Sequence, residues 1–295
     1  MRTTVLGRMT ETEGKIMKKI LIATTALVAT AGVAAADVSV SGWAYGIAYS
    51  GDAFVADGGT EIERGGRIQF GASTETDGGL GLSYYARMTS YNGSESEPSV
   101  SWNRVSMSFQ NMSLDLGNAN GAGQSTARYT MGYIGVDNSG VGAGLGLADN
   151  RTATTHSDGG DRLVFKYTMG NVLVAASADL DGEGVTEAGI KYTDNGLTVG
   201  YSANSESEWR AAASYALGNV KVGMGANSDD TVQGGVSYNM GGGLTVAALL
   251  ASKTAGDSFG LDVSYDLGGG ATLAAQFGED AAGNNGVAAG IFFSF

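Results

Sequence analysis

The chain ends with the stretch Gly286-Val287-Ala288-Ala289-Gly290-Ile291-Phe292-Phe293-Ser294-Phe295. Every second residue from Val287 to Phe295 is apolar, and the residues between them are small, with Phe292 as the one exception. Successive side chains of a β-strand point to opposite faces, so a period of two indicates a strand with one apolar face. We therefore expect the chain to end in a strand that carries Phe295 on its apolar face.

The same period recurs backwards along the chain as far as residue 38. In the runs Phe259 to Tyr265 and Trp209 to Tyr215, apolar residues alternate with small or polar ones. Counting such runs predicts sixteen strands. They cover residues 38–50, 61–75, 79–90, 99–110, 112–117, 161–169, 171–179, 185–193, 196–204, 208–217, 219–227, 230–239, 243–251, 257–266, 270–279 and 286–295.

Two kinds of connection separate these runs, and they alternate strictly along the chain. One kind is tight and rich in Asn and Gly, such as Asp194-Asn195-Gly196, and supplies the positive φ angles of short hairpin turns. The other kind is longer and more acidic, and the connection 118–160 is far longer than the rest. An even number of strands, with short turns on one side and long loops on the other, is typical of membrane barrels. The sequence thus predicts an all-β fold, a sixteen-stranded antiparallel transmembrane β-barrel.

The composition favours a hollow barrel and excludes several other classes. The 295 residues include 49 glycines, one proline, one histidine and no cysteine, which excludes disulfide scaffolds, thiolate metal sites and multi-histidine metal sites. One face of most strands carries Gly, Ala, Ser, Thr or charged residues; such a face makes a poor packed core but suits a water-filled lumen. The formal net charge of −13 repels phosphate and argues against nucleic-acid binding.

The first 36 residues differ from the rest of the chain. Met17-Lys18-Lys19 supplies a positive start, residues 20–32 are apolar, and Ala34-Ala35-Ala36 supplies small residues for a signal peptidase. We interpret residues 17–36 as a secretory signal peptide and residues 1–16 as a misannotated upstream start. The mature protein is then the barrel domain, residues 37–295.

Several stretches of the chain resemble those of a known family. They are the opening strand Val38-Ser39-Val40-Ser41-Gly42-Trp43, the stretch Asp161 to Tyr167, and the terminal strand that ends in Phe295. With the signal peptide and the order of loop lengths, they resemble general porins of the Gram-negative outer membrane, most of all the compact alphaproteobacterial type.

This resemblance implies a function and a set of partners. It implies a homotrimer in outer-membrane lipid, with the long third loop, 118–160, folded into each pore, and with Phe295 as the signal for the outer-membrane assembly machinery. Each pore is then a water-filled channel for passive diffusion of small hydrophilic solutes and ions. A substrate-selective outer-membrane channel and a surface-exposed structural or adhesive β-protein remain as alternatives.

A diffusion pore requires a constriction with a size limit and an electric field rather than catalytic groups. Three arginines are candidates for its basic side. Ile68, Met88 and Val105 mark the lipid face of three adjacent strands, so alternation points Arg67, Arg87 and Arg104 into the lumen. Each arginine alone could equally be an exposed charge at a loop base, but a lipid-facing arginine costs about 2–4 kcal/mol at the bilayer midplane.

The acidic side is expected on the long loop, which follows the fifth strand, where the family places its constriction loop. Asp137 and Asp149 are the candidates there, against the simpler interpretation of a solvated acidic loop. On later strands Lys166, Lys191, Arg210 and Lys221 share the inward parity, and we interpret them as wall charges.

The remaining patterns predict neither an enzyme nor a cofactor. His156 has no recognisable serine or carboxylate partners for catalysis, so we expect no enzyme. The acidic loops could hold calcium, although the spaced EF-hand pattern is absent, and no other cofactor or metal is expected. Aromatic residues near strand ends fit interfacial girdles; they are Trp43, Tyr45, Tyr49, Trp102, Trp209, Tyr215, Tyr238 and Tyr265.

Overall fold

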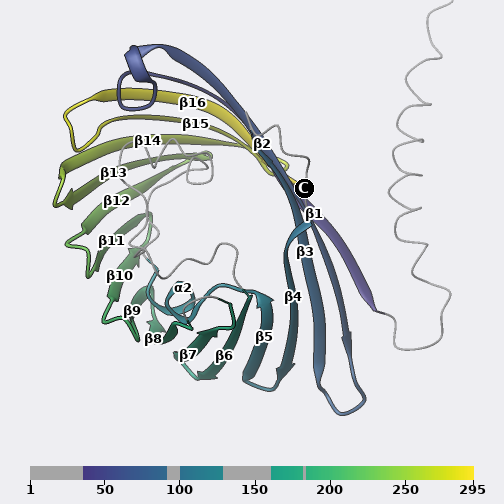
Figure 1. Cartoon of the computed structure of the whole chain (residues 1–295). Coiled ribbons are helices and arrows are strands. Elements are labelled where there is room, and N and C mark those ends of the chain that lie inside the picture. Colours follow the sequence, from purple (N-terminus) through teal and green to yellow (C-terminus); the bar gives the residue numbers. More distant parts are fainter. Residues whose placement is uncertain (1–35, 92–99, 129–160, 182–183) are drawn as a thin grey trace, which may run out of the picture.

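The computed structural model describes residues 36–91, 100–128, 161–181 and 184–295, and these residues form a closed antiparallel barrel (Figure 1). Its strands are β1 (Asp37–Ser50), β2 (Thr60–Glu75), β3 (Gly81–Tyr91), β4 (Val100–Phe109), β5 (Met112–Asn118), β6 (Asp161–Met169), β7 (Val172–Asp179), β8 (Thr186–Asp194), β9 (Leu197–Asn204), β10 (Trp209–Leu217), β11 (Val220–Asn227), β12 (Val232–Gly241), β13 (Leu244–Lys253), β14 (Gly256–Gly268), β15 (Ala271–Glu279) and β16 (Asn285–Ser294). Two short helices, η1 (Ala56–Gly58) and α2 (Ala122–Thr126), complete the described elements.

These strands confirm the predicted sixteen-stranded antiparallel barrel, and every strand end lies within two residues of the expected one. One connection is shorter than expected. The predicted strands 243–251 and 257–266 leave five residues between them, but β13 and β14 stay paired until Lys253 lies opposite Gly256. Gly256 has a φ of +134°, which a residue with a side chain rarely adopts, so this glycine lets the hairpin turn at once.

The pairing of β1 with β16 closes the barrel, and we call it the closing seam. At its end the Gly42 N–H donates to a terminal oxygen of Phe295 at 2.8 Å, and the Phe295 N–H donates to the Gly42 carbonyl at 3.0 Å. β1 also pairs with β2 along its whole length, so the C-terminus lies beside the first strand (Figure 1). The barrel therefore has no free sheet edge between Gly42 and Ser50.

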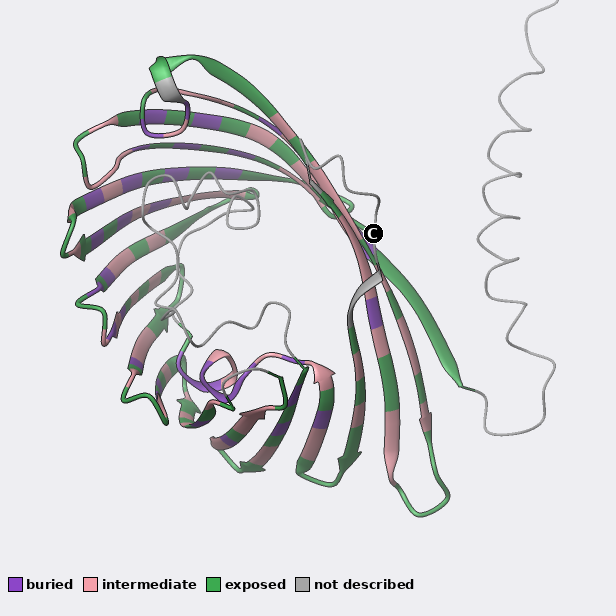
Figure 2. Cartoon of the chain, in the orientation of Figure 1, coloured by how far each residue is buried: buried purple, intermediate pink, exposed green. Residues whose placement is uncertain are grey.

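The outer face of the barrel is apolar and exposed. Less and more exposed positions alternate along the strands (Figure 2). Large apolar residues at the exposed positions recur around the barrel, among them Ile68, Phe70, Val105, Met107, Phe165, Ile190, Val199, Val222, Val236, Leu261, Phe277, Ile291 and Phe293. Such a surface is typical of a barrel whose outer face meets lipid.

Three aromatic residues near the closing seam face inward instead. Trp43, Tyr45 and Tyr49 were expected in interfacial girdles, and this expectation is wrong. Tyr45 is only 5% exposed and packs in a cluster with Ile47 against the inner wall. From Gly42 to Ala48 the outward positions of β1 hold only glycine and alanine, and its aromatic residues fall on the other parity. Farther along the chain, the expected outward aromatics are exposed; they are Trp209, Tyr215, Tyr238 and Tyr265.

In the described part of the chain, no helix is long and apolar enough to cross a membrane.

The packing at the closing seam predicts that adding one methyl group at Gly42 destabilises the barrel. A Cβ at Gly42 would lie 2.3 Å from the backbone carbonyl oxygen of Arg67 and 2.7 Å from the Phe295 ring, so Gly42→Ala must displace the seam. We expect it to lower the temperature at which the folded barrel changes its migration in gel electrophoresis. Gly234→Ala on β12 is the control, because its Cβ would meet only an ordinary contact at 3.7 Å. Equal transition temperatures for the two variants would contradict the described seam.

Candidate functional site

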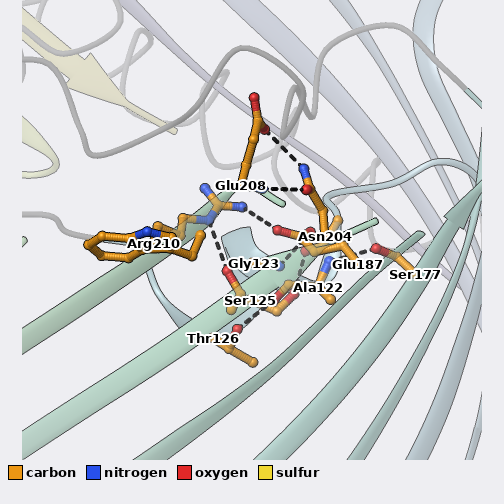
Figure 3. Close-up of polar contacts among 12 residues, drawn as sticks. Ala122, Gly123, Ser125, Thr126, Ser177, Glu187, Asn204, Glu208 and Arg210 are labelled. Carbon is orange, nitrogen blue, oxygen red and sulfur yellow. Dashed lines mark hydrogen bonds and ion pairs between the residues drawn. The ribbon is translucent and has the colours of Figure 1, made fainter. Parts of the chain in front are cut away.

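The chain turns into the barrel after β5, and α2 lies against the inner wall of β7, β8 and β9 (Figure 1). Two backbone N–H groups at the start of α2 are held by side chains of that wall. The Ala122 N–H donates to Ser177 Oγ at 2.9 Å, and the Gly123 N–H donates to Glu187 Oε2 at 2.7 Å (Figure 3). These N–H groups have no partner within the helix, so the wall supplies the partners they need.

The other end of α2 is held by a cation. Lys191 on β8 donates from Nζ to the carbonyl oxygen of Ser125 at 2.9 Å. The last carbonyls of a helix lack intrahelical partners and carry partial negative charge, so a lysine stabilises this end.

Glycines on the wall and in α2 allow the close approach. A Cβ at Gly200 on β9 would lie 1.8 Å from the Thr126 carbonyl oxygen, and one at Gly189 on β8 would lie 2.1 Å from Thr126 Oγ1. A Cβ at Gly123 would lie 2.1 Å from a carboxylate oxygen of Glu187. The sequence indicated small side chains on the inner face of the strands, and part of that face is the surface against which α2 packs.

A buried ion pair lies beneath α2. Arg210 Nη2 on β10 and Glu187 Oε1 on β8 lie 3.2 Å apart, and their side chains are only 1% and 7% exposed. The Arg210 Nε–H also donates to Ser202 Oγ at 3.3 Å. Glu187 thus accepts from Arg210 and from the Gly123 N–H together, which joins three elements at one carboxylate (Figure 3).

Two further ion pairs lie on the same inner wall. Lys166 Nζ on β6 donates to Asp115 Oδ2 on β5 at 2.9 Å, and Arg162 on β6 pairs with Asp179 on β7. These pairs neutralise part of the charge of the wall and connect neighbouring strands.

Arg67 lies on the inner face, as alternation predicted. It is opposite Trp43 of β1 and Thr89 of β3, and its Nε–H donates to Thr89 Oγ1 at 3.2 Å. Its guanidinium carbon lies 4.9 Å from the centre of the Trp43 ring. Ile68, the next residue, is exposed on the outer face.

Arg87 and Arg104 lie on the same inner face. Arg87 of β3 is opposite Gln69 of β2, and Arg104 of β4 is opposite Tyr85 of β3. The guanidinium carbon of Arg104 lies 5.4 Å from the centre of the Tyr85 ring. The structure therefore brings the three predicted arginines together on the adjacent strands β2, β3 and β4.

The other predicted site residues fall in two groups. Asp137 and Asp149, like His156 and the whole segment 1–35, lie outside the described residues. Phe295 lies at the closing seam, where its side chain is 62% exposed on the outer face beside Phe293. Among the described residues, no group of three or more His, Cys, Asp or Glu side chains is placed to hold a metal ion.

Sequence reasoning missed the acidic partners of the wall. Arg210 and Lys166 were interpreted as simple wall charges, but each is paired with a carboxylate. The parity of Glu187 and Asp115 puts them on the inner face, and this signal could have found them. Their partners depend on the strand register and on the path of the chain after β5, which alternation alone does not fix.

The geometry is thus a closed barrel with a polar inner wall and a segment of the chain folded against it. A profile of the family described as Gram-negative porin matches residues 23–293. The chain belongs to the Gram-negative porin family. This porin is an outer-membrane protein that crosses the membrane many times and forms a channel for passive diffusion.

Solved porin structures share the fold. A mutant of Rhodopseudomonas blastica porin has a TM-score of 0.75 at 15% sequence identity, over 88% of this chain and 100% of that chain. A second mutant of the same porin has a TM-score of 0.71 at 14% identity over the same shares. A search of curated protein sequences found no match.

The buried pair beneath α2 predicts a test of how this segment is held. Glu187→Gln removes the carboxylate charge that faces the buried guanidinium of Arg210, and loss of one member of a buried ion pair typically costs about 3–5 kcal/mol. We expect a lower unfolding temperature and more current noise in the open channel, because α2 loses a contact that holds it to the wall. Glu206→Gln, in an exposed loop, is the matched control and should change neither measurement. Unchanged noise and stability in Glu187→Gln would show that the pair does not fix α2.

Proposed function

We propose that this porin is a general diffusion pore for small hydrophilic solutes and ions, narrowed by the segment that begins with α2 and by the basic wall of β2, β3 and β4. The observation that carries the proposal is the seating of α2 inside the barrel, where a packed core would leave no room for it. The family and the fold support a channel rather than an enzyme.

The electric field of the pore follows from the charges on its wall. Arg67, Arg87 and Arg104 form the basic side of the proposed constriction, with Asp137 and Asp149 as its acidic side. Screening is strong beyond about 8 Å at physiological salt, so charges next to the narrowest section dominate the selectivity and the net charge of the chain does not. Polar solutes align in a transverse field of this kind, whereas apolar ones disrupt ordered water.

The proposed assembly is a homotrimer in outer-membrane lipid. Support comes from the family and from the outer face of β1, where Ala44, Gly46 and Ala48 offer small side chains beside the closing seam. Flat surfaces of small residues allow close approach of a second barrel. Phe295, exposed at the end of β16, is the proposed signal for the outer-membrane assembly machinery.

The arginine wall predicts a change in ion selectivity. A unit charge 4 Å from a passing ion contributes about 1 kcal/mol in water, or about fivefold in partitioning. Replacing Arg67, Arg87 and Arg104 together by serine should therefore raise the cation-to-anion permeability ratio several-fold and increase the single-channel conductance. The reversal potential in a KCl gradient across a planar bilayer measures the first effect.

The acidic side provides the opposite test. Replacing Asp137 and Asp149 by asparagine should shift the selectivity toward anions with little change in conductance, because side-chain volume is conserved.

The arginine prediction has its own contradicting outcome. If the variant with Arg67, Arg87 and Arg104 replaced by serine keeps the parent's reversal potential and conductance, these arginines do not line the constriction.

The N-terminal segment generates a prediction about processing. Residues 17–36 are the proposed signal peptide, and residues 1–16 precede the proposed start at Met17. Mass spectrometry of the protein from outer membranes should find Asp37 as the first residue. Detection of residues 1–36 on the mature protein would contradict this proposal.

A further inference from the structure

Aromatic rings line the inner wall where the barrel closes. Trp43 and Tyr45 of β1 stack with their ring centres 5.7 Å apart and their planes at 21°. Tyr45 also contacts Phe292 of β16, with 5.9 Å between the ring centres. Tyr45 is buried in this cluster, whereas Trp43 and Phe292 are partly exposed and present apolar area to the lumen, which costs free energy in contact with water.

Two arginines continue this surface across β2, β3 and β4. Arg67 lies over the Trp43 ring at 4.9 Å, and Arg104 lies over the Tyr85 ring at 5.4 Å. The Tyr85 hydroxyl donates to Gln69 Oε1 at 2.5 Å, which fixes the orientation of the ring that Arg104 contacts. We call this surface the aromatic strip; it consists of Phe292, Tyr45, Trp43, Arg67, Tyr85 and Arg104.

The charges of the aromatic strip remain available to a solute. The inner-wall cations Arg162, Lys166 and Arg210 are each paired with a carboxylate. Arg67 and Arg104, in contrast, form no ion pair with a carboxylate of the described residues, and Arg104 Nε is buried without a hydrogen-bond partner. A guanidinium over a ring keeps its full charge, since the ring attracts it without neutralising it.

The side chains that would meet a solute are accessible from the lumen. Trp43, Arg67, Tyr85 and Arg104 are all partly exposed. They lie on adjacent strands with their side chains on one face, so a small molecule can contact a ring and a guanidinium at the same time.

We propose that the aromatic strip is a binding subsite for ring-bearing organic anions, with aromatic carboxylates as its ligand class. The inference rests on the proposed diffusion function, which it deepens by naming a favoured class of solute. The carboxylate contacts Arg104, and the ring of the solute contacts Tyr85. An aromatic carboxylate carries both groups within a few ångströms, which matches the spacing of each arginine and its ring.

Aromatic carboxylates differ from other anions and from neutral aromatic solutes in the contacts they can make here. An inorganic anion or acetate uses the guanidinium alone, and a neutral ring uses the aromatic surface alone. Bidentate hydrogen bonds from arginine to a carboxylate and offset ring contacts act together only on a solute that has both groups. The subsite must also release the solute, because flux through a channel requires weak binding.

Single-channel recording in planar bilayers tests the proposal with benzoate as the probe, at pH 7 and in constant KCl. Benzoate should reduce the KCl current at about tenfold lower concentration than acetate or cyclohexanecarboxylate; a tenfold ratio corresponds to about 1.4 kcal/mol. Tyr85→Leu should remove most of this preference, and Tyr85→Phe should retain it. Tyr84→Leu is the matched control, because Tyr84 directly precedes Tyr85 on β3 and faces outward with 46% exposure. It should behave as the parent protein does.

Arg104→Gln provides a second variant if Tyr85→Leu does not assemble, and it should also abolish the preference for benzoate. The subsite is overturned if channels conduct KCl normally but benzoate acts at the same concentration as acetate or cyclohexanecarboxylate. It is also overturned if Arg104→Gln or Tyr85→Leu leaves the preference intact. Absence of any conducting channel from the parent protein would instead overturn the proposed function, and the subsite with it.

Discussion

The hydrocarbon interior of a membrane offers no hydrogen-bond partners, so a chain that crosses it in strands must pair the backbone groups of those strands. In this porin that requirement is met at the closing seam, where Gly42 and Phe295 exchange two backbone hydrogen bonds. The seam fixes the register of the first strand against the last, and this register agrees with the facing of side chains on both strands. The absence of a Cβ at Gly42 is part of this closure, because the Phe295 ring and the Arg67 carbonyl occupy the space that a side chain needs.

The inner wall of the closed barrel differs from one side to the other, and the chain uses it in two ways. On β7, β8 and β9, glycines and hydroxyl groups seat α2, and the buried pair of Glu187 and Arg210 fixes its position. On β1 to β4, Arg67 and Arg104 lie against aromatic rings. Paired charges thus serve the structure of the pore, whereas Arg67 and Arg104, which form no ion pair with a carboxylate of the described residues, are the charges that we propose act on solutes.

Much of this fold could be predicted from the sequence, because an apolar period of two indicates a β-strand and also shows which of its side chains share a face. Ile68, Met88 and Val105 fix the outward parity of their strands, which correctly placed Arg67, Arg87 and Arg104 on the inner face. The same rule went unused for Trp43, Tyr45 and Tyr49, whose aromatic character suggested a membrane interface. From Gly42 to Ala48 the outward positions of β1 hold only Gly and Ala, so alternation and residue type give opposite predictions for the aromatic residues. The register shows that alternation is correct. The position of α2 on the inner wall could not be predicted from the sequence. The Gly123 N–H reaches Glu187 only because of the path that the chain takes after β5.

The central claim is that the barrel encloses a continuous water-filled lumen, and single-channel conductance as a function of KCl concentration tests it most directly. Purified protein reconstituted into a planar bilayer should produce discrete current steps whose conductance rises in proportion to the KCl concentration, because ions cross such a lumen largely as they move in bulk water. The absence of steps, or a conductance that saturates at low salt, would contradict a water-filled lumen.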